Sequence, residues 1–279
     1  ISVCLVGSEM CIRDRDIGNG SVNNLMTWSS DLLDDVNGVL ITHLHSDHIA
    51  DLGDLNLVTW VTRDRKQKLE VYGPEGINDV VSGFNLAFSR DSNFRYLNHG
   101  NQIADPITAG MIAKEISNGS IIFEDDNLKI SAFRVFHEPV EPALGFRFEY
   151  KDRVLVISGD TRYDSELIKS FKDADILFCE VISPKIVERF IKVADEQNDD
   201  KLKKILVDIL DYHITPLEAV DLANEAMVRH LVFYHITPTL PTEIRFLSDK
   251  FFFEGVDEAI ENWTASTDGT MVVLPSNSK

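Results

Sequence analysis

The sequence predicts a layered α/β fold, and three observations lead to this prediction. Stretches with strand character and stretches with helical spacing mix throughout the chain, as is typical of α/β domains. Two hairpins are expected between residues 121 and 160, and no repeat, linker or low-complexity run divides the chain. The 279 residues are 44% hydrophobic, which is enough for a large core in one domain or at most two.

The expected strands are apolar or alternating stretches bounded by turn residues. They cover 37–41, 69–74, 175–182 and 230–236, together with hairpins over 121–136, turning about Asp126 and Asn127, and over 145–160. The expected helices have apolar residues at helical intervals. They cover 48–61, 75–97 as a helix or two, 184–210 with a charged break at 195–201, and 216–228. This order of elements supports the layered α/β prediction.

The chain is strongly acidic, with a formal net charge of −19. Such a charge favours solubility and repels nucleic acid and anionic membranes, although a generally solvated surface accounts for most of it. No run of 18 apolar residues is present, so no membrane span is expected and the cytoplasm is the expected location. Two of the three cysteines, Cys4 and Cys11, lie near the N-terminus, which argues against a disulfide framework and predicts that Cys179 is a buried structural thiol.

The first fifteen residues have the character of a foreign segment. Residues 5–14, LVGSEMCIRD, match the translation of a transposon-end adapter used in sequencing libraries, and the next adapter bases begin an Arg or Ser codon, as at Arg15. The hypothesis is that 1–15 derive from the adapter and that native sequence covers 16–279. The competing interpretation is an ordinary apolar first strand. Under the hypothesis the native N-terminus is missing, so a signal peptide would not be seen, and 1–15 are excluded from fold reasoning.

Residues 42–48, THLHSDH, concentrate three imidazoles and a carboxylate between an expected strand and an expected helix. Loops held by rigid elements are common places for function. Without a metal, three imidazoles so close together would crowd cations or leave buried nitrogens unsatisfied. Imidazole and carboxylate are ligands that Zn²⁺ accepts. The cluster therefore predicts a metal site.

Three further candidate ligands follow expected strands elsewhere in the chain. His137 follows SAFRVF, Asp160 follows RVLVISG, and His235 follows LVFY. Side chains at strand ends can converge at one rim of a sheet. Each of these is a weak signal alone, because a single histidine on an apolar strand is usually packed, and His99 and His230 are interpreted in that way.

These motifs, in this order, resemble the metallo-β-lactamase superfamily from Asp16 to about residue 275. The pattern H-x-H-x-D-H at 43–48, the GDT at 159–161 and the single histidines carry the resemblance, and 137–149 and 213–238 are similar to the ribonuclease Z and arylsulfatase-type branch. The resemblance implies a four-layer αββα sandwich over 16–279, lacking its first strands if 1–15 are foreign. It implies a metal-dependent hydrolase.

The resemblance also implies a ligand set for two Zn²⁺ ions, with Mn²⁺ or Fe²⁺ as alternatives. A hydroxide shared by the two ions would attack the substrate at neutral pH. Asp16 and Thr161 would support the metal ligands without binding metal themselves. Asp47 would act in catalysis as well as in metal binding. The implied ligands are His43, His45 and His137 for the first ion, Asp47, His48 and His235 for the second, and Asp160 for both.

A proton donor follows from the same resemblance. His213 matches the histidine of a ribonuclease Z motif and would protonate the leaving oxygen, which is worth about 10²–10⁴ in rate. Glu180 would orient His213. The family motif HEAT is here CEVI, with Cys179 in place of the histidine, and this departure puts the ribonuclease details in doubt.

The substrate is expected to be a small phosphodiester, sulfate ester or related ester. Ribonuclease Z has a basic arm between its motif histidine and GDT, whereas here a plain hairpin fills the interval from His137 to Asp160. The longest basic stretch, 63–68, is expected to be a solvated helix end, and the net charge opposes a polyanion. A tRNA 3′-processing endonuclease is the alternative, and an inactive metal-binding fragment is a second one. No membrane partner is expected, and a homodimer is an open alternative to a monomer.

Overall fold

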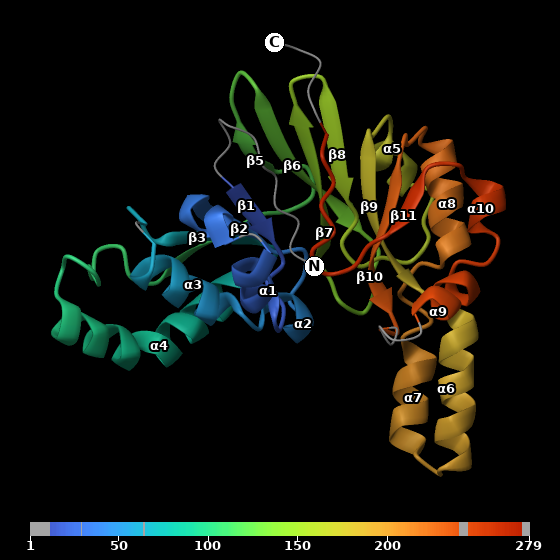
Figure 1. Cartoon of the computed structure of the whole chain (residues 1–279), viewed down its shortest axis with the longest axis horizontal. Helices are drawn as coiled ribbons and strands as arrows, with labels where there is room; N and C mark the ends of the chain where they lie inside the picture. Colours follow the sequence, from blue (N-terminus) through green and yellow to red (C-terminus); the bar gives the residue numbers. More distant parts are fainter. Residues whose placement is uncertain (1–11, 29, 64, 240–244, 275–279) are drawn as a thin grey trace. The chain divides into compact units, whose positions relative to one another are not determined.

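The computed structural model describes residues 12–28, 30–63, 65–239 and 245–274 (Figure 1). The chain forms two compact units, Ile1–Ser117 and Asn118–Lys279. Each unit is built on its own sheet, of four and of seven strands among the described residues. The predicted α/β class is confirmed, with helices and strands mixed in both units.

The sheet of the first unit is parallel, in the order β1 (Ile12–Arg15), β2 (Val36–Leu40), β3 (Leu69–Gly73) and β4 (Met111–Glu115). Its core joins Val39, Leu69 and Val71 of the strands to Leu52 and Leu55. Strand β1 comes from the segment that matches the adapter. The helices are α1 (Ser21–Trp28), the 3₁₀ helix η1 (Ser30–Asp35), α2 (Ser46–Ile49), α3 (Leu52–Val61) and α4 (Ile77–His99).

The helix predicted over 48–61 is interrupted at Asp51, and α2 and α3 lie on either side of the break. The backbone N–H of Asp51 donates to Ile17 O at 2.9 Å instead of closing a helical turn. Its carboxylate accepts from Val22 N at 3.3 Å. The break therefore ties the start of α3 to the chain segment that follows β1.

The basic stretch 63–68, predicted to be a solvated helix end, is solvated at residues 66–68, but Arg65 within it is an exception. Arg65 is buried, and burial lowers the pKa of its guanidinium to about 10. The guanidinium donates to Asn56 Oδ1 at 3.0 Å and Thr59 Oγ1 at 3.0 Å of α3, and to the carbonyls of Thr108 and Gly110 at 2.8 and 3.3 Å. Arg65 therefore joins α3 to the loop before β4, and no acid is among these partners.

The sheet of the second unit is mixed, and the two predicted hairpins form its antiparallel part. Strands β8, β9, β10 and β11 are parallel. Because β6 and β8 both run antiparallel to β7, the strands β6, β8, β9 and β10 end at the same rim. The order is β11 (Trp263–Ala265), β10 (Leu231–Thr237), β9 (Ile176–Ile182), β8 (Arg153–Ile157), β7 (Ala143–Tyr150), β6 (Leu128–Val135) and β5 (Ile121–Glu124).

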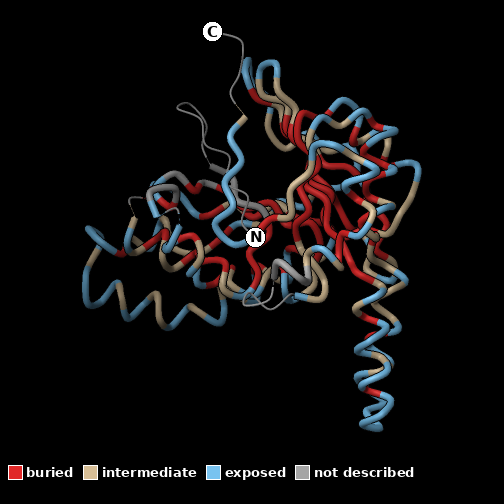
Figure 2. Tube along the Cα trace, turned by 45° about the vertical axis from the view of Figure 1, so that its right-hand side comes forward, coloured by how far each residue is buried: buried red, intermediate tan, exposed pale blue. Residues whose placement is uncertain are grey.

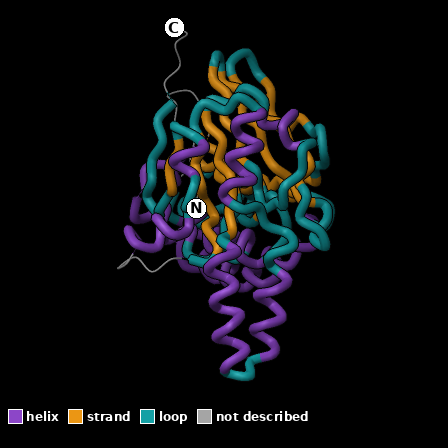
Figure 3. The backbone as a smooth tube through the Cα atoms, turned by 90° about the vertical axis from the view of Figure 1, so that its right-hand side faces the viewer, coloured by secondary structure: helices purple, strands orange, loops and turns teal. Residues whose placement is uncertain are grey.

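The core of the second unit lies around β9, whose residues are all buried. Figure 2 shows buried chain concentrated in these strands. Helices α5 (Leu167–Phe171), α8 (Pro216–Glu225), α9 (Arg245–Phe252) and α10 (Val256–Ala259) belong to this unit. Helices α6 (Pro184–Glu196) and α7 (Asp200–Asp208) form a hairpin that extends beyond the sheet of the unit (Figure 3). Within the described ranges, no helix has the length and apolar character of a membrane span.

Candidate metal centre

In the first unit the candidate ligands lie in the loop after β2, and Asp16 supports this loop. Parallel pairing of β1 with β2 brings Asp16 beside Thr42. The carboxylate of Asp16 accepts from Thr42 N and Thr42 Oγ1, both at 2.8 Å. Asp16 adopts a φ of 44°, a backbone conformation in which aspartate is one of the few tolerated residues. Asp16 therefore fixes the backbone at the start of the loop independently of the imidazoles.

Hydrogen bonds orient two imidazoles so that Nε2 faces away from the support. His48 Nδ1 lies 2.9 Å from Asp16 Oδ2, a carboxylate oxygen, so Nδ1 is the donor. His43 Nδ1 lies 3.1 Å from Thr42 Oγ1, whose hydrogen is directed to Asp16, so the imidazole is again the donor. Both rings therefore carry the lone pair on Nε2. Metal-binding histidines are held in this way through their other nitrogen.

Distances within the loop match those between ligands of one ion. His43 Nε2 and His45 Nδ1 are 3.0 Å apart, and His48 Nε2 and Asp47 Oδ2 are 3.4 Å apart. Two ligands of a tetrahedral Zn²⁺ with bonds of about 2.0–2.1 Å are separated by about 3.3 Å. The donor set and its spacing therefore fit divalent metal.

Gly18 brings the segment after β1 into direct contact with this loop. A Cβ added to Gly18 would lie 1.8 Å from the backbone oxygen of Asp47, which no side chain allows. The adjacent Ile17 N donates to His48 O at 2.8 Å. The DIGNG sequence is therefore more than a turn, because it supports the loop with both a carboxylate and a close backbone contact.

In the second unit the candidate residues come from separate strands that end at one rim. His137 follows β6, Asp160 follows β8, Glu180 lies in β9 and His235 lies in β10. His137, Asp160 and Glu180 are buried, and His235 is partly buried. The expected convergence at a sheet rim is therefore present within this unit.

The orientation of His137 and His235 comes from the backbone. His137 Nδ1 donates to Tyr212 O at 2.9 Å, which leaves the lone pair on Nε2 as in the first unit. His235 occupies an irregularity in the pairing of β10 with β9, where the register shifts between Tyr234 and Ile236, and its φ is 47°. Such irregularities re-aim side chains. His235 Nε2 consequently lies 3.6 Å from Asp160 Oδ2, again close to the spacing of two ligands on one ion.

A buried carboxylate lies behind His213. His213 Nδ1 donates to Glu180 Oε1 at 2.8 Å, and the same oxygen accepts from Thr161 N at 3.0 Å. Burial raises the pKa of Glu180 above its ordinary value; His213 acts in the opposite direction and Asp160 adds to the rise. Glu180 and Thr161 therefore hold the imidazole of His213 with Nε2 directed away from the carboxylate.

His213 is itself within reach of the candidate ligands of its unit. One ligand atom each of Asp160, His213 and His235 lie within 4.8 Å of one another. The ring centroids of His213 and His137 are 5.1 Å apart. His213 can therefore act as a ligand or as a proton donor beside the ligands, and the geometry admits both roles.

Residues that sequence analysis missed support the site through the backbone or a hydroxyl. Thr42 directly precedes the histidine cluster, which is the one signal that could have found it, whereas Tyr212 contributes a carbonyl that no sequence pattern marks.

Cys179 is buried in β9, which raises the pKa of its thiol, and it is the inert residue expected. His230 lies outside the site, with Nε2 2.9 Å from Thr264 Oγ1. His99 is exposed at the end of α4, so the prediction that it packs is wrong.

Comparisons with known proteins show which family the chain is similar to. The family model described as a beta-lactamase superfamily domain matches residues 21–236. The chain is 32% identical over 206 residues to ribonuclease Z of Mycobacterium sp. (strain KMS), covering 74% of this chain and 67% of the relative. It is 34% identical over 207 residues to ribonuclease Z of Mycobacterium bovis (strain BCG / Pasteur 1173P2), covering 74% and 69%.

Solved structures share the fold. The short form of human tRNase Z matches with a TM-score of 0.67 and 21% identity, covering 99% of this chain and 92% of the other. Zinc-bound PqqB from Methylobacterium extorquens matches with a TM-score of 0.65 and 15% identity, covering 98% and 86%.

Proposed function

We propose, from the premise that this chain belongs to the metallo-β-lactamase superfamily and to its ribonuclease Z branch, that it cleaves phosphodiester bonds in RNA as a ribonuclease Z-type endonuclease. The chain is a metal-dependent hydrolase. The observation that carries the metal-dependent part of the proposal is the set of imidazoles held through Nδ1, an arrangement that leaves Nε2 of each ring as the candidate ligand atom. A packed structural histidine needs no such arrangement.

We propose further that the candidate ligands of both units hold the same two ions. The donor set of neutral imidazoles and carboxylates suits Zn²⁺, and Mn²⁺ or Fe²⁺ are alternatives. Two bound ions would lower the pKa of water toward about 7 and neutralise charge on the phosphoryl oxygens. The proposed ligands are His43, His45 and His137 for one ion, Asp47, His48 and His235 for the other, and Asp160 for both.

The role of His213 in the proposal is to deliver a proton to the leaving oxygen. Glu180 and Thr161 fix the ring, so that Nε2 holds the proton at a constant position. General acids of this kind contribute about 10²–10⁴ in rate. Glu180 acts through His213, so it is a positioning residue. Thr161 in turn anchors Glu180 through its backbone N–H.

RNA replaces the small ester as the preferred substrate because of the relatives. The ribonuclease Z sequences match at 32–34% identity over about three quarters of the chain. A small phosphodiester remains the second candidate, and one observation favours it. The interval from His137 to Asp160 holds the plain hairpin of β7 and β8, with no extended arm among its residues.

A substrate panel on the metal-loaded chain tests the proposal. The substrates are a precursor tRNA with a 3′ trailer, bis(p-nitrophenyl) phosphate and p-nitrophenyl sulfate. The proposal expects cleavage of the precursor at a single position near the end of the acceptor stem, with slower turnover of the diester. Turnover of the small diester with an intact precursor would favour the second candidate. Preparations of His43→Ala, a proposed ligand variant, control for contaminating nucleases.

A further inference from the structure

The segment that carries His213 directly precedes α8, and the residues on both sides of His213 are held by hydrogen bonds of their backbone. Tyr212 O accepts from His137 Nδ1 at 2.9 Å. Ile214 is fully buried, and its carbonyl accepts from Ile182 N at 2.8 Å. One neighbour of His213 is therefore fixed by a candidate metal ligand, and the other is fixed by the end of β9.

Thr215 begins α8 with a reciprocal set of hydrogen bonds to Glu218. Glu218 Oε2 accepts from Thr215 N at 2.9 Å and from Thr215 Oγ1 at 2.7 Å. In return, Thr215 Oγ1 accepts from Glu218 N at 3.4 Å. Such a capping box satisfies two backbone N–H groups that have no partner within the helix. Pro216 restricts the preceding residue to extended conformations, and Thr215 has a φ of −82° and a ψ of 159°. The chain therefore enters α8 in one fixed direction.

This capping box is unusual within the chain. Among the helices whose N-cap residue the structure describes, only α7 and α8 have an N-cap side chain that accepts a backbone N–H, and only α8 has a capping box. In α7 the N-cap is Asp199, whose Oδ1 accepts from Leu202 N at 2.9 Å. The most complete of these caps therefore lies two residues after His213, the candidate proton donor.

The core of the second unit holds α8 in place independently of its cap. One face of the helix is fully buried and belongs to the apolar cluster that includes residues of β9. Its members are Ala219, Val220, Leu222 and Ala223. Because burial of such a face supplies most of the stability of a helix in a protein, α8 does not need the cap to keep its position. The capping box therefore connects a rigid helix to the residues before it, and we expect its loss to release those residues without displacing α8.

We propose that Thr215 and Glu218 are positioning residues for His213, an inference that rests on the proton donor of the proposed function. His213 Nδ1 donates to Glu180 Oε1 at 2.8 Å, which holds one edge of the ring. A single hydrogen bond lets a ring pivot about it, so the position of Nε2 also depends on the backbone of His213. The capping box fixes that backbone. A proton passes only between atoms about 2.6–3.2 Å apart, so a small displacement of Nε2 lowers the rate of transfer.

Turnover of two diesters by the metal-loaded chain separates positioning from general stability. Diphenyl phosphate has a poorer leaving group than bis(p-nitrophenyl) phosphate and depends more on protonation of the leaving oxygen. We expect Thr215→Ala and Glu218→Ala to slow diphenyl phosphate by about tenfold and bis(p-nitrophenyl) phosphate by about twofold or less, with metal content unchanged. Thr215→Ser and Glu218→Gln keep the acceptors and donors of the box and should restore both rates.

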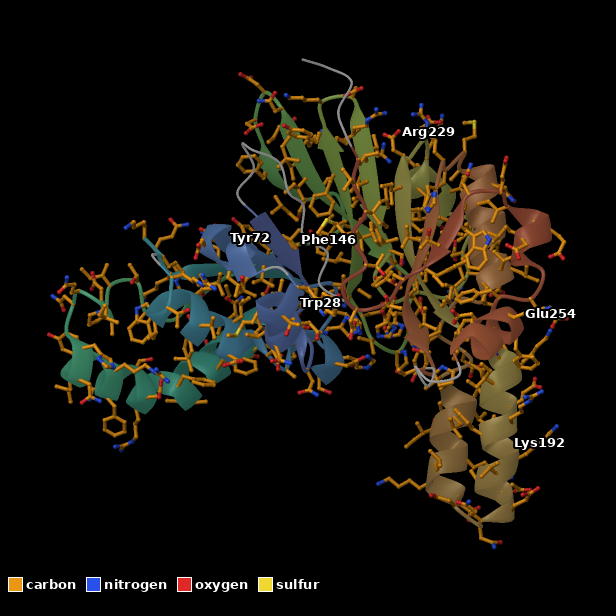
Figure 4. All side chains as sticks on the ribbon, in the orientation of Figure 1. Trp28, Tyr72, Phe146, Lys192, Arg229 and Glu254 are labelled. Atoms are coloured by element: carbon orange, nitrogen blue, oxygen red, sulfur yellow. The ribbon has the colours of Figure 1, made fainter. Side chains whose placement is uncertain are left out.

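Asp199→Ala removes the cap of α7 and is the matched control. This cap lies at the far end of the hairpin of α6 and α7, and Figure 4 shows that Lys192, midway along α6, already lies well beyond the sheet of the unit. The loss of a cap should lower the melting temperature of Asp199→Ala and of Thr215→Ala to a similar degree. The ratio of the two turnover rates should change in Thr215→Ala alone.

The proton on His213 Nδ1 gives a second readout that needs no turnover. The side chain of His213 is 8% exposed, and its hydrogen bond to Glu180 protects this proton from exchange with water. Its NMR signal in the zinc-loaded chain is identified by its loss in His213→Ala. We expect Thr215→Ala to broaden the signal, and Thr215→Ser and Asp199→Ala to keep it as in the wild type.

Two results would overturn the inference. One is a wild-type ratio of rates together with an unchanged Nδ1 signal in Thr215→Ala and Glu218→Ala. The other is an equal change of the ratio and the signal in Asp199→Ala, which would make the effect one of general stability. If His213→Ala slows both diesters equally, the proton donor of the proposed function is wrong, and the Nδ1 signal still decides whether the capping box positions the ring.

Discussion

The two units present their candidate ligands in contrasting ways. In the first unit they lie within one loop, from His43 to His48, and a single carboxylate, Asp16, supports that loop. In the second unit they lie on strands distant in sequence, from His137 to His235, and the order and direction of the strands bring them to one rim. A local cluster depends on a few hydrogen bonds. A dispersed cluster depends on the register of a whole sheet.

The largest effect is expected from Asp160→Ala, which removes the proposed shared ligand of the second unit. Loss of a residue that only supports a metal ligand costs about 10–100-fold in metal affinity or activity. Loss of a ligand itself should cost more, so we expect turnover to fall by more than about 10³-fold, together with metal content. Metal analysis and diester turnover on the same preparation measure both. Asp126→Ala, at the exposed β5–β6 turn, is the matched control and should change neither. Full metal content in Asp160→Ala would show that the second unit does not supply this ligand.

The second-largest effect tests whether His213, in the second unit, is a metal ligand or a proton donor. His213→Ala should lower turnover by about 10²–10⁴ while metal content is unchanged. The loss should be smaller for a substrate with a good leaving group such as p-nitrophenolate, which needs little protonation. His230→Ala, outside the site, serves as the control histidine. If His213→Ala loses metal, the residue is a ligand and the proposed role is wrong.

A smaller effect is expected from Asp16→Asn in the first unit. An amide in place of the carboxylate weakens the acceptor of His48 Nδ1 and Thr42 Oγ1 without emptying the space. Metal affinity should fall by about 10–100-fold, measured by competition with a chromophoric chelator. Asp54→Ala, at an exposed position of α3, should leave the affinity as it is. An unchanged affinity in Asp16→Asn would show that the loop is organised without its carboxylate.

The smallest effect concerns β9, the buried strand that carries Glu180. Burial holds the pKa of the Cys179 thiol well above its ordinary value of 9.0. Above pH 9 the unfolded chain therefore loses the thiol proton while the native chain keeps it, so the free energy of unfolding declines by up to about 1.4 kcal/mol per pH unit from this group. Urea titrations at pH 8 to 10.5 measure the slope. Cys179→Ala should have a shallower slope, and identical slopes would mean that β9 opens to solvent.

The sequence predicted the elements whose patterns are local. Hairpins over 121–136 and 145–160 were predictable because alternation and turn residues are adjacent in the chain. Strand β4 was missed, since the sequence MIAKE carries one buried residue at the edge of its sheet. The break at Asp51 was missed because it depends on the carbonyl of Ile17, which is remote in sequence.

The same distinction between local patterns and contacts remote in sequence applies to the candidate site. The cluster at 43–48 was evident from residue types alone, whereas His137, Asp160 and His235 required the order of motifs in a known family. The hydrogen bond from His137 to the carbonyl of Tyr212 could not be predicted, because a carbonyl is present at every residue. The burial of Arg65 was likewise unpredictable, since its partners are mostly amide and carbonyl oxygens.

The contact of Gly18 with Asp47 has a consequence for protein engineering. Two stretches that are separate in the chain meet there backbone to backbone, with no room for even a methyl group. A chimera that imports the histidine loop from a relative must import the glycine segment with it, since a shift of either backbone would displace the other. A library that randomises the loop alone would therefore sample only loop sequences that are compatible with the existing backbone of the glycine segment. A library that varies the loop and the glycine segment together would reach a wider range of backbone conformations.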